Sequence, residues 1–534
     1  MSSTPTHTTV VDVLIIGMGP VGKMAGLLLA RAGHTVTVVD HRESDYPLPR
    51  AVGHDSEIAR LFQSAGLPVD LMAEAVDSYD DLYIWANGRD EVLQELDISG
   101  TGPSGWGNMY FYHQPSLEAR LDAALRSYPG VTVRRGVRAA VAAQDERGVD
   151  VELSPIAENG AGSVIRAGYV LAADGANGST RKDLGIKWHD LGYFFDWLVV
   201  DIIPGPDAKV THLAKQVCDP ARPTTVVPAG PGRRRWEFML KPEDDPSTIV
   251  QPENIWKLLE PFGINTANSQ MERGVVYTFA AAWAEKWRSG RVFLLGDAAH
   301  LMPPFAAQGL ASGFRDGLNL SWKLDLVLRG KAGDALLDSY DSERIPQVNG
   351  LIDFSMALAQ VICISDPQIA AARDEQMIAA MKSGAAPAPL PTPKLGPGVH
   401  VGEHGGELSR QGMILTSNLA APARFDDVYG AGALILRGAE MRDALTAEDT
   451  ARLAEVGIAV AVFAAGCSHP GSFSDVEGSY ARWFQEWQTG AILIRADFSV
   501  FGTASNPADV SELVAGLLEA LHARVSPRSQ EATA

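Results

Sequence analysis

One short segment near the start of the chain restricts the fold more than any other. The mostly apolar residues 10–16 lead into the turn GMGPVG at residues 17–22, and a helix-forming stretch over residues 23–32 follows. A second apolar run, residues 35–39, ends at Asp40. A strand, a glycine turn, a helix and a second strand that ends in an acid are typical of a dinucleotide-binding βαβ unit.

Each glycine of this turn has an expected task. Gly17 would permit the tight turn, Gly19 would let the backbone approach a pyrophosphate, and Gly22 would let helix and strand pack closely. The phosphates would meet the free N–H groups at the positive end of the helix. Asp40 would accept hydrogen bonds from ribose hydroxyls. The turn alone does not distinguish FAD from NAD.

Two further strand ends favour FAD. Asp174 follows a predicted strand over residues 169–173, and Gly296-Asp297 follows another over residues 291–295. Either one alone is more typical of an ordinary turn. Their order after Gly17 favours carboxylates that bind the hydroxyls of a sugar-like chain. Because the sequence has a single GxGxxG, a nicotinamide reductant would visit a site built around one resident cofactor.

Length and composition limit the remaining possibilities. A chain of 534 residues predicts two or three domains. A net charge of −20 argues against a nucleic acid or an anionic membrane as partner. The polar N-terminus without a signal-peptide pattern, and the lack of a long apolar run, favour a cytoplasmic protein. Cys218, Cys363 and Cys467 are far apart, so neither a disulfide framework nor a metal site is expected.

The rest of the chain divides by pattern. Residues 197–279 are rich in predicted strands, and residues 311–382 are helical with breaks expected at Gly330 and Pro346. A Pro/Ala-rich stretch from residue 384 predicts an extended linker. Beyond it, alternating strands and helices indicate a separate small α/β domain.

Three motifs carry a family resemblance. GMGPVG, ADGANGSTRKDLG and GDAAHLMPPFAAQGLASGFRDGLNLSWKL together resemble the single-component flavoprotein aromatic hydroxylases of the p-hydroxybenzoate hydroxylase fold. PRAVG, WLVVD, RRWEF and YDSERIP are similar to its 3-(3-hydroxyphenyl)propionate hydroxylase branch. The similarity extends from about residue 10 to residue 350 and is fainter beyond the linker.

The resemblance implies an α/β fold in three parts. A Rossmann-like FAD-binding domain would comprise residues 1–85, 108–190 and 287–383. A β-rich substrate domain, residues 86–107 and 191–286, would be inserted into it. A linker, 384–400, would lead to a thioredoxin-like α/β domain, 401–534. Because Cys467 stands alone, we expect packing or oligomerisation rather than redox chemistry from this last domain.

The resemblance also implies roles for single residues. Arg50 and Gln114 would face the flavin and its ribityl chain, and Asp174 would lie where FAD and the nicotinamide share space. The other residues expected to bind FAD are Gly17, Gly19 and Gly22 at the pyrophosphate, Asp40 at the adenosine ribose, Gly296 and Asp297 at the ribityl or pyrophosphate portion, and Pro304, Gly309 and Leu310 beside the isoalloxazine. A helix start there would stabilise the negative charge of reduced flavin.

The implied reaction is hydroxylation of a small phenolic acid such as 3-(3-hydroxyphenyl)propionate. NADH or NADPH would reduce FAD, and O2 would form a C4a-hydroperoxyflavin that hydroxylates the carbon beside the phenolic hydroxyl. No metal is needed. A base that deprotonates the phenol is expected; His54 is the first candidate, followed by Tyr110 and His113. Related phenol hydroxylases carry an acid near this stretch, where this chain has Val52.

Several alternatives stay open. A carboxylated substrate would want a cationic partner, and Arg233, Arg234 and Arg235 are candidates, although a solvated face explains them as well. The same motifs would suit a hydroxylase of polycyclic polyketides or a flavin reductase or dehydrogenase that does not activate oxygen. A flavin-binding sensor or scaffold is the non-enzymatic alternative. A homodimer is a further expectation.

Overall fold

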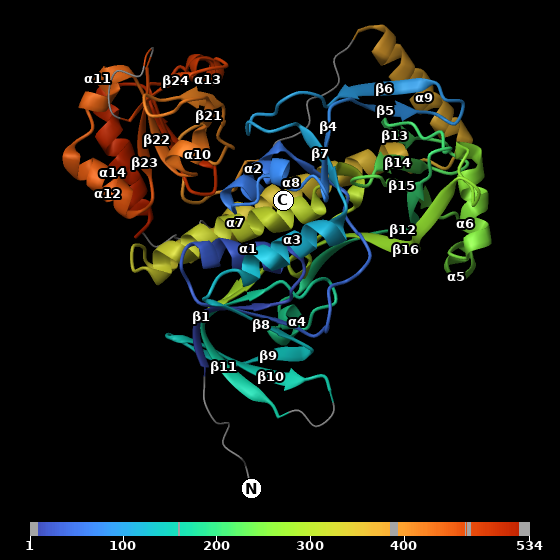
Figure 1. Ribbon diagram of the computed structural model, residues 1–534, viewed down its shortest axis with the longest axis horizontal. Coiled ribbons are helices and arrows are strands. Elements are labelled where there is room, and N and C mark those ends of the chain that lie inside the picture. Colours follow the sequence, from blue (N-terminus) through green and yellow to red (C-terminus); the bar gives the residue numbers. More distant parts are fainter. Residues whose placement is uncertain (1–8, 158–160, 385–393, 465, 467–470, 523–534) are drawn as a thin grey trace, which may run out of the picture.

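A computed structural model describes residues 9–157, 161–384, 394–464, 466 and 471–522. Figure 1 shows three bodies: a sheet with its covering helices around β1 and α1, a second sheet around β12 to β16, and the C-terminal domain in orange and red. The small sheet β3-β7-β4 and the helix α2 (Ser56–Ser64) lie between them, where β3 is Gly53–Asp55, β7 is Met109–Tyr112 and β4 is Val76–Tyr79.

The first sheet is built on parallel strands. Their order is β18 (Val292–Leu294), β11 (Ser163–Ala172), β1 (Thr9–Ile16), β2 (Val36–Asp40) and β8 (Val131–Arg135). Helices α1 (Pro20–Arg31), α3 (Gln114–Arg126) and α7 (Gly309–Leu328) pack on one face, and the antiparallel strands β9 (Val137–Asp145) and β10 (Gly148–Pro155) cover the other. Because both faces of the sheet are covered, β1, β2 and β18 are apolar along most of their length, and the sequence shows them as nearly continuous apolar runs.

The second sheet is antiparallel except between β13 and β5. Its order is β19 (His300–Leu301), β16 (Ser269–Ala284), β12 (Trp188–Pro204), β15 (Arg234–Met239), β14 (Thr224–Pro228), β13 (Ala214–Val217), β5 (Leu82–Ala86) and β6 (Val92–Asp97). Helices α5 (Pro246–Ile249) and α6 (Pro252–Leu259) lie at one face, where Leu198, Trp236 and Phe238 form a core with Ile255 of α6. The opposite face turns toward the first sheet. Strand β5 begins at Leu82, so the predicted boundary at residues 85–86 falls inside it.

Three helices form the region predicted over residues 311–382. The break near Gly330 is confirmed, because α7 ends at Leu328. The break at Pro346 is wrong: α8 runs without interruption over Ser339–Ile362 and precedes α9 (Pro367–Lys382). Pro346 cannot donate to the carbonyl of Ser342, but Gly396 packs against that carbonyl and donates to the neighbouring carbonyl of Glu343 at 2.9 Å. Packing from another segment therefore keeps the helix intact.

The C-terminal domain has a thioredoxin-like arrangement. Parallel β22 (Ala433–Arg437) and β23 (Ala459–Phe463) are followed across the sheet by antiparallel β25 (Ala491–Ile494) and β26 (Val500–Ala504). The remaining strands are β20 (Met413–Leu415), β21 (Ala423–Arg424) and β24 (Ser472–Asp475), and the helices are α10 (Phe425–Tyr429), α11 (Gly438–Asp443), α12 (Ala447–Glu455), α13 (Ser479–Glu486) and α14 (Val510–Ala520). Cys467 and most of the predicted linker lie outside the described residues.

The domain's apolar core continues into the first body. Leu434 and Val514 of the C-terminal domain belong to one buried cluster with Leu326 of α7 and with Leu336, which follows it. The C-terminal domain is therefore joined to the end of α7 by shared apolar packing.

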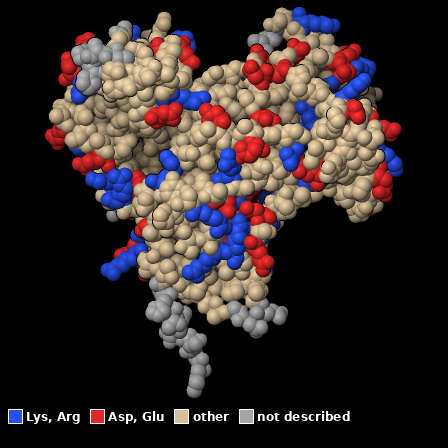
Figure 2. All heavy atoms as spheres, in the orientation of Figure 1, with Lys and Arg blue, Asp and Glu red and all other residues tan. Residues whose placement is uncertain are grey.

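Neither the distribution of charge nor the hydropathy of the helices marks out a special surface. Acidic and basic side chains are interspersed over the face shown in Figure 2. Within the described part of the chain, no single helix has both the length and the apolar character to cross a membrane. The segments Asp334–Ile362 and Pro367–Lys382 pass that test only as a pair, bent by 108°.

Candidate active site

The carboxyl ends of the parallel strands meet at one edge of the first sheet. Backbone hydrogen bonds close this edge: Gly17 N donates to Val39 O at 2.8 Å, Ala173 N to Ile16 O at 2.8 Å and Leu295 N to Ala172 O at 2.9 Å. The turns that carry Gly17, Asp40, Asp174 and Asp297 consequently lie side by side. Ligands of open α/β sheets bind in the crevice at this edge.

The glycine turn leaves room at only one of its three glycines. Gly17 has φ +104°, and a Cβ on it would lie 2.2 Å from the carbonyl oxygen of Ala173. A Cβ on Gly22 would lie 2.1 Å from the carbonyl oxygen of Gly17. By contrast, a Cβ on Gly19 would meet no described atom within 4 Å. Two glycines therefore serve close packing, and the open space at Gly19 fits a pyrophosphate at the start of α1.

Two carboxylates at this edge have unequal surroundings. Asp40 accepts hydrogen bonds from Met18 N at 2.7 Å through Oδ2 and from Arg42 N at 2.7 Å through Oδ1. Asp174 accepts from the backbone N and the hydroxyl of Thr180 through Oδ2 alone. Its Oδ1 is buried and has no hydrogen-bond partner among the described residues. A cofactor hydroxyl or amide would meet the need of this oxygen.

A third set of residues joins the edge to the neighbouring loop. Gln114 Oε1 accepts from the backbone N of both Arg50 and Ala51 at 2.8 Å, which fixes the loop. Arg50 reaches to 4.0 Å from Asp297, and both side chains are about half exposed, at 49% and 50%. Gly296 N donates to the buried Asp316 of α7 at 3.0 Å. The structure thus brings Arg50, Gln114 and Asp297 together with the strand ends.

The start of α7 lies at the same place. A Cβ on Gly313 of α7 would lie 3.2 Å from Gly296 Cα, so the first turns of this helix pass against the strand end. Gln308, the residue before the helix, is held by Arg315 at 2.7 Å and by Asp55 at 3.2 Å. The first intrahelical bond is from Ser312 N to Gln308 O. The N–H groups of Gly309 and Leu310 precede that bond, so the positive helix end is available to an electron-rich ring.

The face of the second sheet that turns toward this edge carries a buried ionic cluster. Asp201 of β12 binds Arg235 of β15 in a bidentate pair of 2.7 and 3.0 Å, and Arg273 of β16 lies 2.9 Å from the same carboxylate. Arg235 also donates to the carbonyl oxygen of Arg50 at 2.6 Å. The cluster therefore ties the substrate sheet directly to the loop beside the cofactor edge.

Glu237 lies on the same face of the second sheet, two residues after Arg235 along β15. It is paired in register with Thr225 of β14 and with Val199 of β12. Its side chain is 13% exposed, and its nearest cation, Arg235 Nη1, is 3.6 Å away. Burial raises the pKa of the Glu237 carboxyl above its ordinary value, although Arg235 acts in the opposite direction. This carboxyl makes no hydrogen bond to any described residue.

The three predicted bases lie on β3, on β7 and at the residue before α3. His54 and Tyr110 are stacked at 5.0 Å between ring centroids, on the face of β3 and β7 that packs into the core of the first body. The ring Nδ1 of His54 contacts Asp55 O at 2.9 Å, and burial lowers the pKa of His54 to about 4. His113 contacts Ser116 at 2.8 Å, with Glu272 at 3.9 Å. None of the three contacts Glu237 or the described glycine turn.

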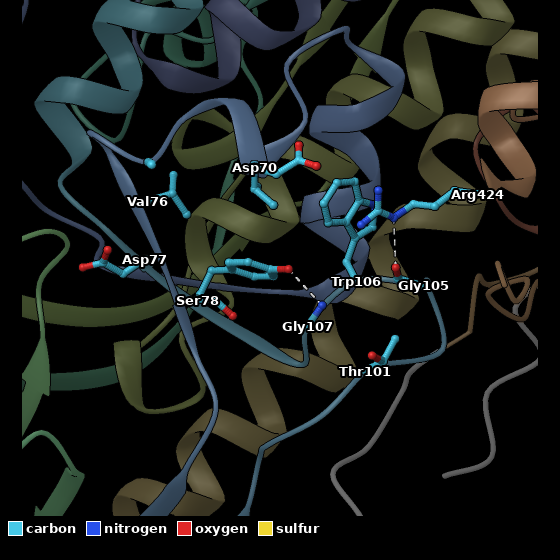
Figure 3. Close-up of a pocket in the computed structure, with 12 residues that line it drawn as sticks. Asp70, Val76, Asp77, Ser78, Thr101, Gly105, Trp106, Gly107 and Arg424 are labelled. Carbon is cyan, nitrogen blue, oxygen red and sulfur yellow. Dashed lines mark hydrogen bonds between the residues drawn. The ribbon is translucent and has the colours of Figure 1, made fainter. Parts of the chain in front are cut away.

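Tyr110 instead lines a separate pocket of about 440 Å³ at the C-terminal domain. The backbone N of Gly107 donates to the Tyr110 hydroxyl at 2.9 Å, and a dashed line at Gly107 marks this bond in Figure 3. Arg424 of the C-terminal domain lies 3.4 Å over the ring of Trp106 in the same pocket. The other residues that line it come from the segment before β4, from β4 itself and from the loop that leads into β7.

Neither Glu237 nor Asp201 was predicted as a site residue, although the sequence contains an indication for Glu237. Alternation along Arg234–Met239 sends Arg235 and Glu237 to one face and Trp236 to the other, as the register shows. A lone acid on the inner face of a buried strand is unusual. Which element faces it could not be known without the sheet order. In the part of the chain that is described, no three His, Cys, Asp or Glu side chains are grouped to hold a metal.

Comparisons with known proteins agree with this geometry. A family model described as "FAD binding domain" matches residues 10–355, and one described as "HcaD C-terminal domain" matches residues 406–520. The chain is 36% identical over 519 residues to the probable NADH-specific resorcinol 4-hydroxylase of Rhodococcus jostii (strain RHA1), covering 97% of this chain and 96% of that one.

A second relative and two crystal structures extend the comparison. The 3-(3-hydroxy-phenyl)propionate/3-hydroxycinnamic acid hydroxylase of Mycolicibacterium smegmatis is 37% identical over 68% of this chain and 64% of its own length. The flavin-dependent monooxygenase PieE, solved with FAD and substrate, superposes with a TM-score of 0.79 at 22% identity over 97% of this chain and 100% of PieE. Aklavinone-11 hydroxylase with FAD and aklavinone gives 0.75 at 24% identity over 97% and 99%.

The family match covers well over half of the chain, and the first relative matches it almost from end to end. The cofactor edge has the open glycine, the carboxylates and the helix start that FAD needs. The chain therefore belongs to the single-component FAD-dependent aromatic hydroxylases, monooxygenases that take a nicotinamide nucleotide as co-substrate.

Proposed function

We propose that this enzyme hydroxylates a neutral dihydroxybenzene of the resorcinol type, with NADH as the reductant. The new hydroxyl would enter a ring carbon adjacent to an existing one. The observation that carries the proposal is that Arg235 and Arg273, the arginines described above on the inner face of the substrate sheet, are both ion-paired with Asp201. The near end-to-end similarity to a resorcinol 4-hydroxylase supports it.

The three neighbouring arginines considered for a substrate carboxylate are all engaged. Arg233 is paired with Glu272 at 3.1 Å, and Arg234 donates to the backbone carbonyls of His212 and Leu213. Arg235 is occupied by Asp201 and by Arg50 O. A carboxylated substrate that used one of these three arginines would have to take it from its present partner.

Residues at the cofactor edge would hold FAD in the manner predicted from the sequence. Gly19 and the start of α1 would bind the pyrophosphate, Asp40 the adenosine ribose, and Asp297 with Gly296 the ribityl chain. Arg50, Gln114, Asp174, Pro304, Gly309 and Leu310 would surround the ring system, with Gly17 and Gly22 shaping the turn. Bound FAD supplies reducing equivalents from the nicotinamide and the activation of O2. The protein's own part is to hold the ring, exclude water and accept the phenol proton.

A small phenolic acid is the second candidate. The relative from Mycolicibacterium smegmatis acts, by its name, on 3-(3-hydroxyphenyl)propionate or 3-hydroxycinnamic acid, and it matches 68% of this chain. The exposed guanidinium of Arg50 is the cation nearest the cofactor edge that a carboxylate could reach. This candidate also predicts hydroxylation next to the phenolic oxygen.

One experiment separates the candidates. The FAD-loaded protein is mixed with NADH and, in parallel, with resorcinol, 3-(3-hydroxyphenyl)propionate or no aromatic compound, and product mass is measured together with NADH and O2 consumption. We expect resorcinol to accelerate NADH oxidation and to gain one oxygen atom. Product from the phenolic acid alone would favour the second candidate. NADH oxidation without oxygen insertion into either compound would contradict both and favour a flavin reductase.

A further inference from the structure

Glu237 is a largely buried acid whose carboxylate accepts no hydrogen bond within 3.5 Å from the described residues. Its ion-pair partner, Arg235, directs its hydrogen bonds at Asp201 and Arg50 O instead. The gap of 3.6 Å between Arg235 Nη1 and Glu237 Oε1 is longer than a hydrogen bond. A buried carboxyl with unused acceptors is costly unless a ligand completes it.

The position of Glu237 lies between the two segments that border the cofactor edge. On one side along β15, Arg235 contacts the carbonyl of Arg50. On the other side, Trp197 and Phe279 pack against Phe305 at ring-centroid distances of 5.5 and 6.0 Å, and Phe305 belongs to the loop before α7. Glu237 is therefore aimed at the space between the Arg50 loop and the start of α7.

The other charged and titratable groups around Glu237 come from four strands. Arg235 shares β15, Asp201 is on β12, Arg273 and Tyr277 are on β16, and Tyr83 is on β5. Arg273 donates to the Tyr277 hydroxyl at 3.0 Å and lies against Asp201. Burial raises the pKa of Tyr83 beyond the range in which it ionises in water. Glu237 is consequently the acid of this set whose pKa is raised by burial and whose carboxylate accepts no hydrogen bond within 3.5 Å from the described residues.

We propose that Glu237 binds a hydroxyl of the aromatic substrate and accepts its proton, and so selects neutral polyphenols over phenolic acids. This inference rests on the proposed function. In the proton transfer, the O–H bond of the phenol breaks, its electron pair stays on the phenolate oxygen, and the proton forms a new bond to a carboxylate oxygen of Glu237. The phenolate makes the ring carbon beside it more nucleophilic.

Charge explains the selection. When Glu237 and the substrate hydroxyl share one proton, the pair carries a single negative charge, which the site tolerates. A second carboxylate, brought in by the substrate, would place two acids in a space where the strand arginines are already paired. The desolvation that raises the pKa of Glu237 also brings it closer to the working pH of a general base.

The test uses the FAD-loaded protein, wild type and Glu237→Gln. Glutamine keeps the size of the side chain but cannot take the proton. Calorimetry without NADH measures the Kd of resorcinol and of 3-(3-hydroxyphenyl)propionate, and turnover gives kcat/KM against pH. Glu95→Gln is the matched control, because Glu95 is an exposed acid on β6 of the same sheet. Flavin absorbance per protein confirms equal FAD loading in all samples.

We expect the variant to lose about 10- to 100-fold in kcat/KM for resorcinol, the value of a hydrogen bond to a charged group. Its relative affinity for the phenolic acid should rise, and the decline of wild-type activity on the acid side should disappear. The same resorcinol Kd, kcat/KM and pH profile in wild type and Glu237→Gln would overturn the role of Glu237. Wild-type protein that hydroxylates no dihydroxybenzene would instead contradict the proposed function itself.

Discussion

Two buried glutamates in this molecule have opposite surroundings. Glu343 of α8 accepts hydrogen bonds from Arg495, Lys323, Asn319 and the backbone N of Val399, all between 2.7 and 2.9 Å. Glu237 of β15 accepts none from the described residues. The cations beside Glu343 hold its pKa far below the ordinary value, whereas burial raises the pKa of Glu237.

The difference distinguishes a structural connection between parts of the molecule, here called the joint, from a candidate functional site. Glu343 connects α7, α8 and the C-terminal domain, and every lone pair that faces a donor is used. Such a cluster holds parts of a protein in one arrangement. An acid with unused acceptors is poorly suited to that task, and strongly perturbed, incompletely paired groups are found preferentially at functional sites. The predictions below test whether the two glutamates really differ in this way.

The largest effect is expected at the joint. Glu343→Gln leaves the buried Lys323 without its carboxylate and Arg495 with Asp497 alone, which should destabilise the protein by about 3–5 kcal/mol. The urea midpoint of unfolding measures this. The exposed pair of Lys331 and Glu455, at 3.0 Å, gives the control: Glu455→Gln should change stability by less than about 1 kcal/mol. Equal midpoints for the two variants would show that the buried cluster is no joint.

The second largest effect is expected in the glycine turn, where the space around Gly17 is filled and the space around Gly19 is open. Gly17→Ala would push a Cβ to 2.2 Å from the carbonyl oxygen of Ala173, so we expect loss of folded protein. Gly19→Ala meets no described atom within 4 Å and should fold, yet bind FAD more weakly because the methyl group occupies the pyrophosphate space. Circular dichroism and flavin absorbance per protein check this. Full FAD loading of Gly19→Ala would place the pyrophosphate elsewhere.

A third effect is the sign of the pH dependence. The lowered pKa of Glu343 adds stability above its ordinary value of 4.5, and that stability is lost as the pH falls through the folded-state value. The raised pKa of Glu237 does the reverse: its ionisation opposes folding as the pH rises above 4.5. Glu237→Gln should therefore raise the melting temperature at pH 8 and lose that advantage near pH 4.

Unfolding scans of wild type, Glu237→Gln and Glu343→Gln across this pH range compare the two signs directly. A Glu237→Gln variant that is less stable than wild type at pH 8 would mean that the carboxylate has a structural partner after all.

The smallest effect is expected at Tyr110, one of the bases predicted from the sequence. Tyr110→Phe removes the acceptor of the Gly107 N–H at 2.9 Å, which should lower stability by about 1 kcal/mol. Because Tyr110 lines the pocket at the C-terminal domain, kcat for hydroxylation should stay close to wild type. Steady-state rates and a thermal melt measure both. A large fall in kcat at unchanged FAD loading would return Tyr110 to the candidate bases.

Much of the fold could be predicted because it is encoded locally. The strands β1, β2 and β18 are short apolar runs, and each begins and ends within one residue of its predicted place. The predicted strand over residues 169–173 is the end of the longer β11, which begins at Ser163. The helix through Pro346 could not be predicted, since the packing of Gly396 comes from fifty residues further along the chain.

The cofactor edge could be predicted from local sequence, whereas the substrate side could not. The residues expected at FAD follow strand ends, and parallel pairing gathers strand ends without further information. A substrate site on a sheet face depends on which strands are neighbours. Thr225, Glu237 and Val199 are brought into one row by the order β14-β15-β12, which no local pattern contains. His54 is paired in register with Tyr110 on the small sheet, and its Nε2 is buried without a hydrogen-bond partner among the described residues, so its role as a base stays a prediction.

The shared apolar core at the end of α7 has a consequence for how such enzymes are recombined. Leu326 and Leu336 precede the linker by about fifty residues, yet they lie in one cluster with Leu434 and Val514. A chimera joined at the linker would pair a foreign C-terminal domain with the wrong half of this contact. Exchange of the domain between relatives should therefore include the last turns of α7, because the packed unit extends beyond the segment that the linker delimits.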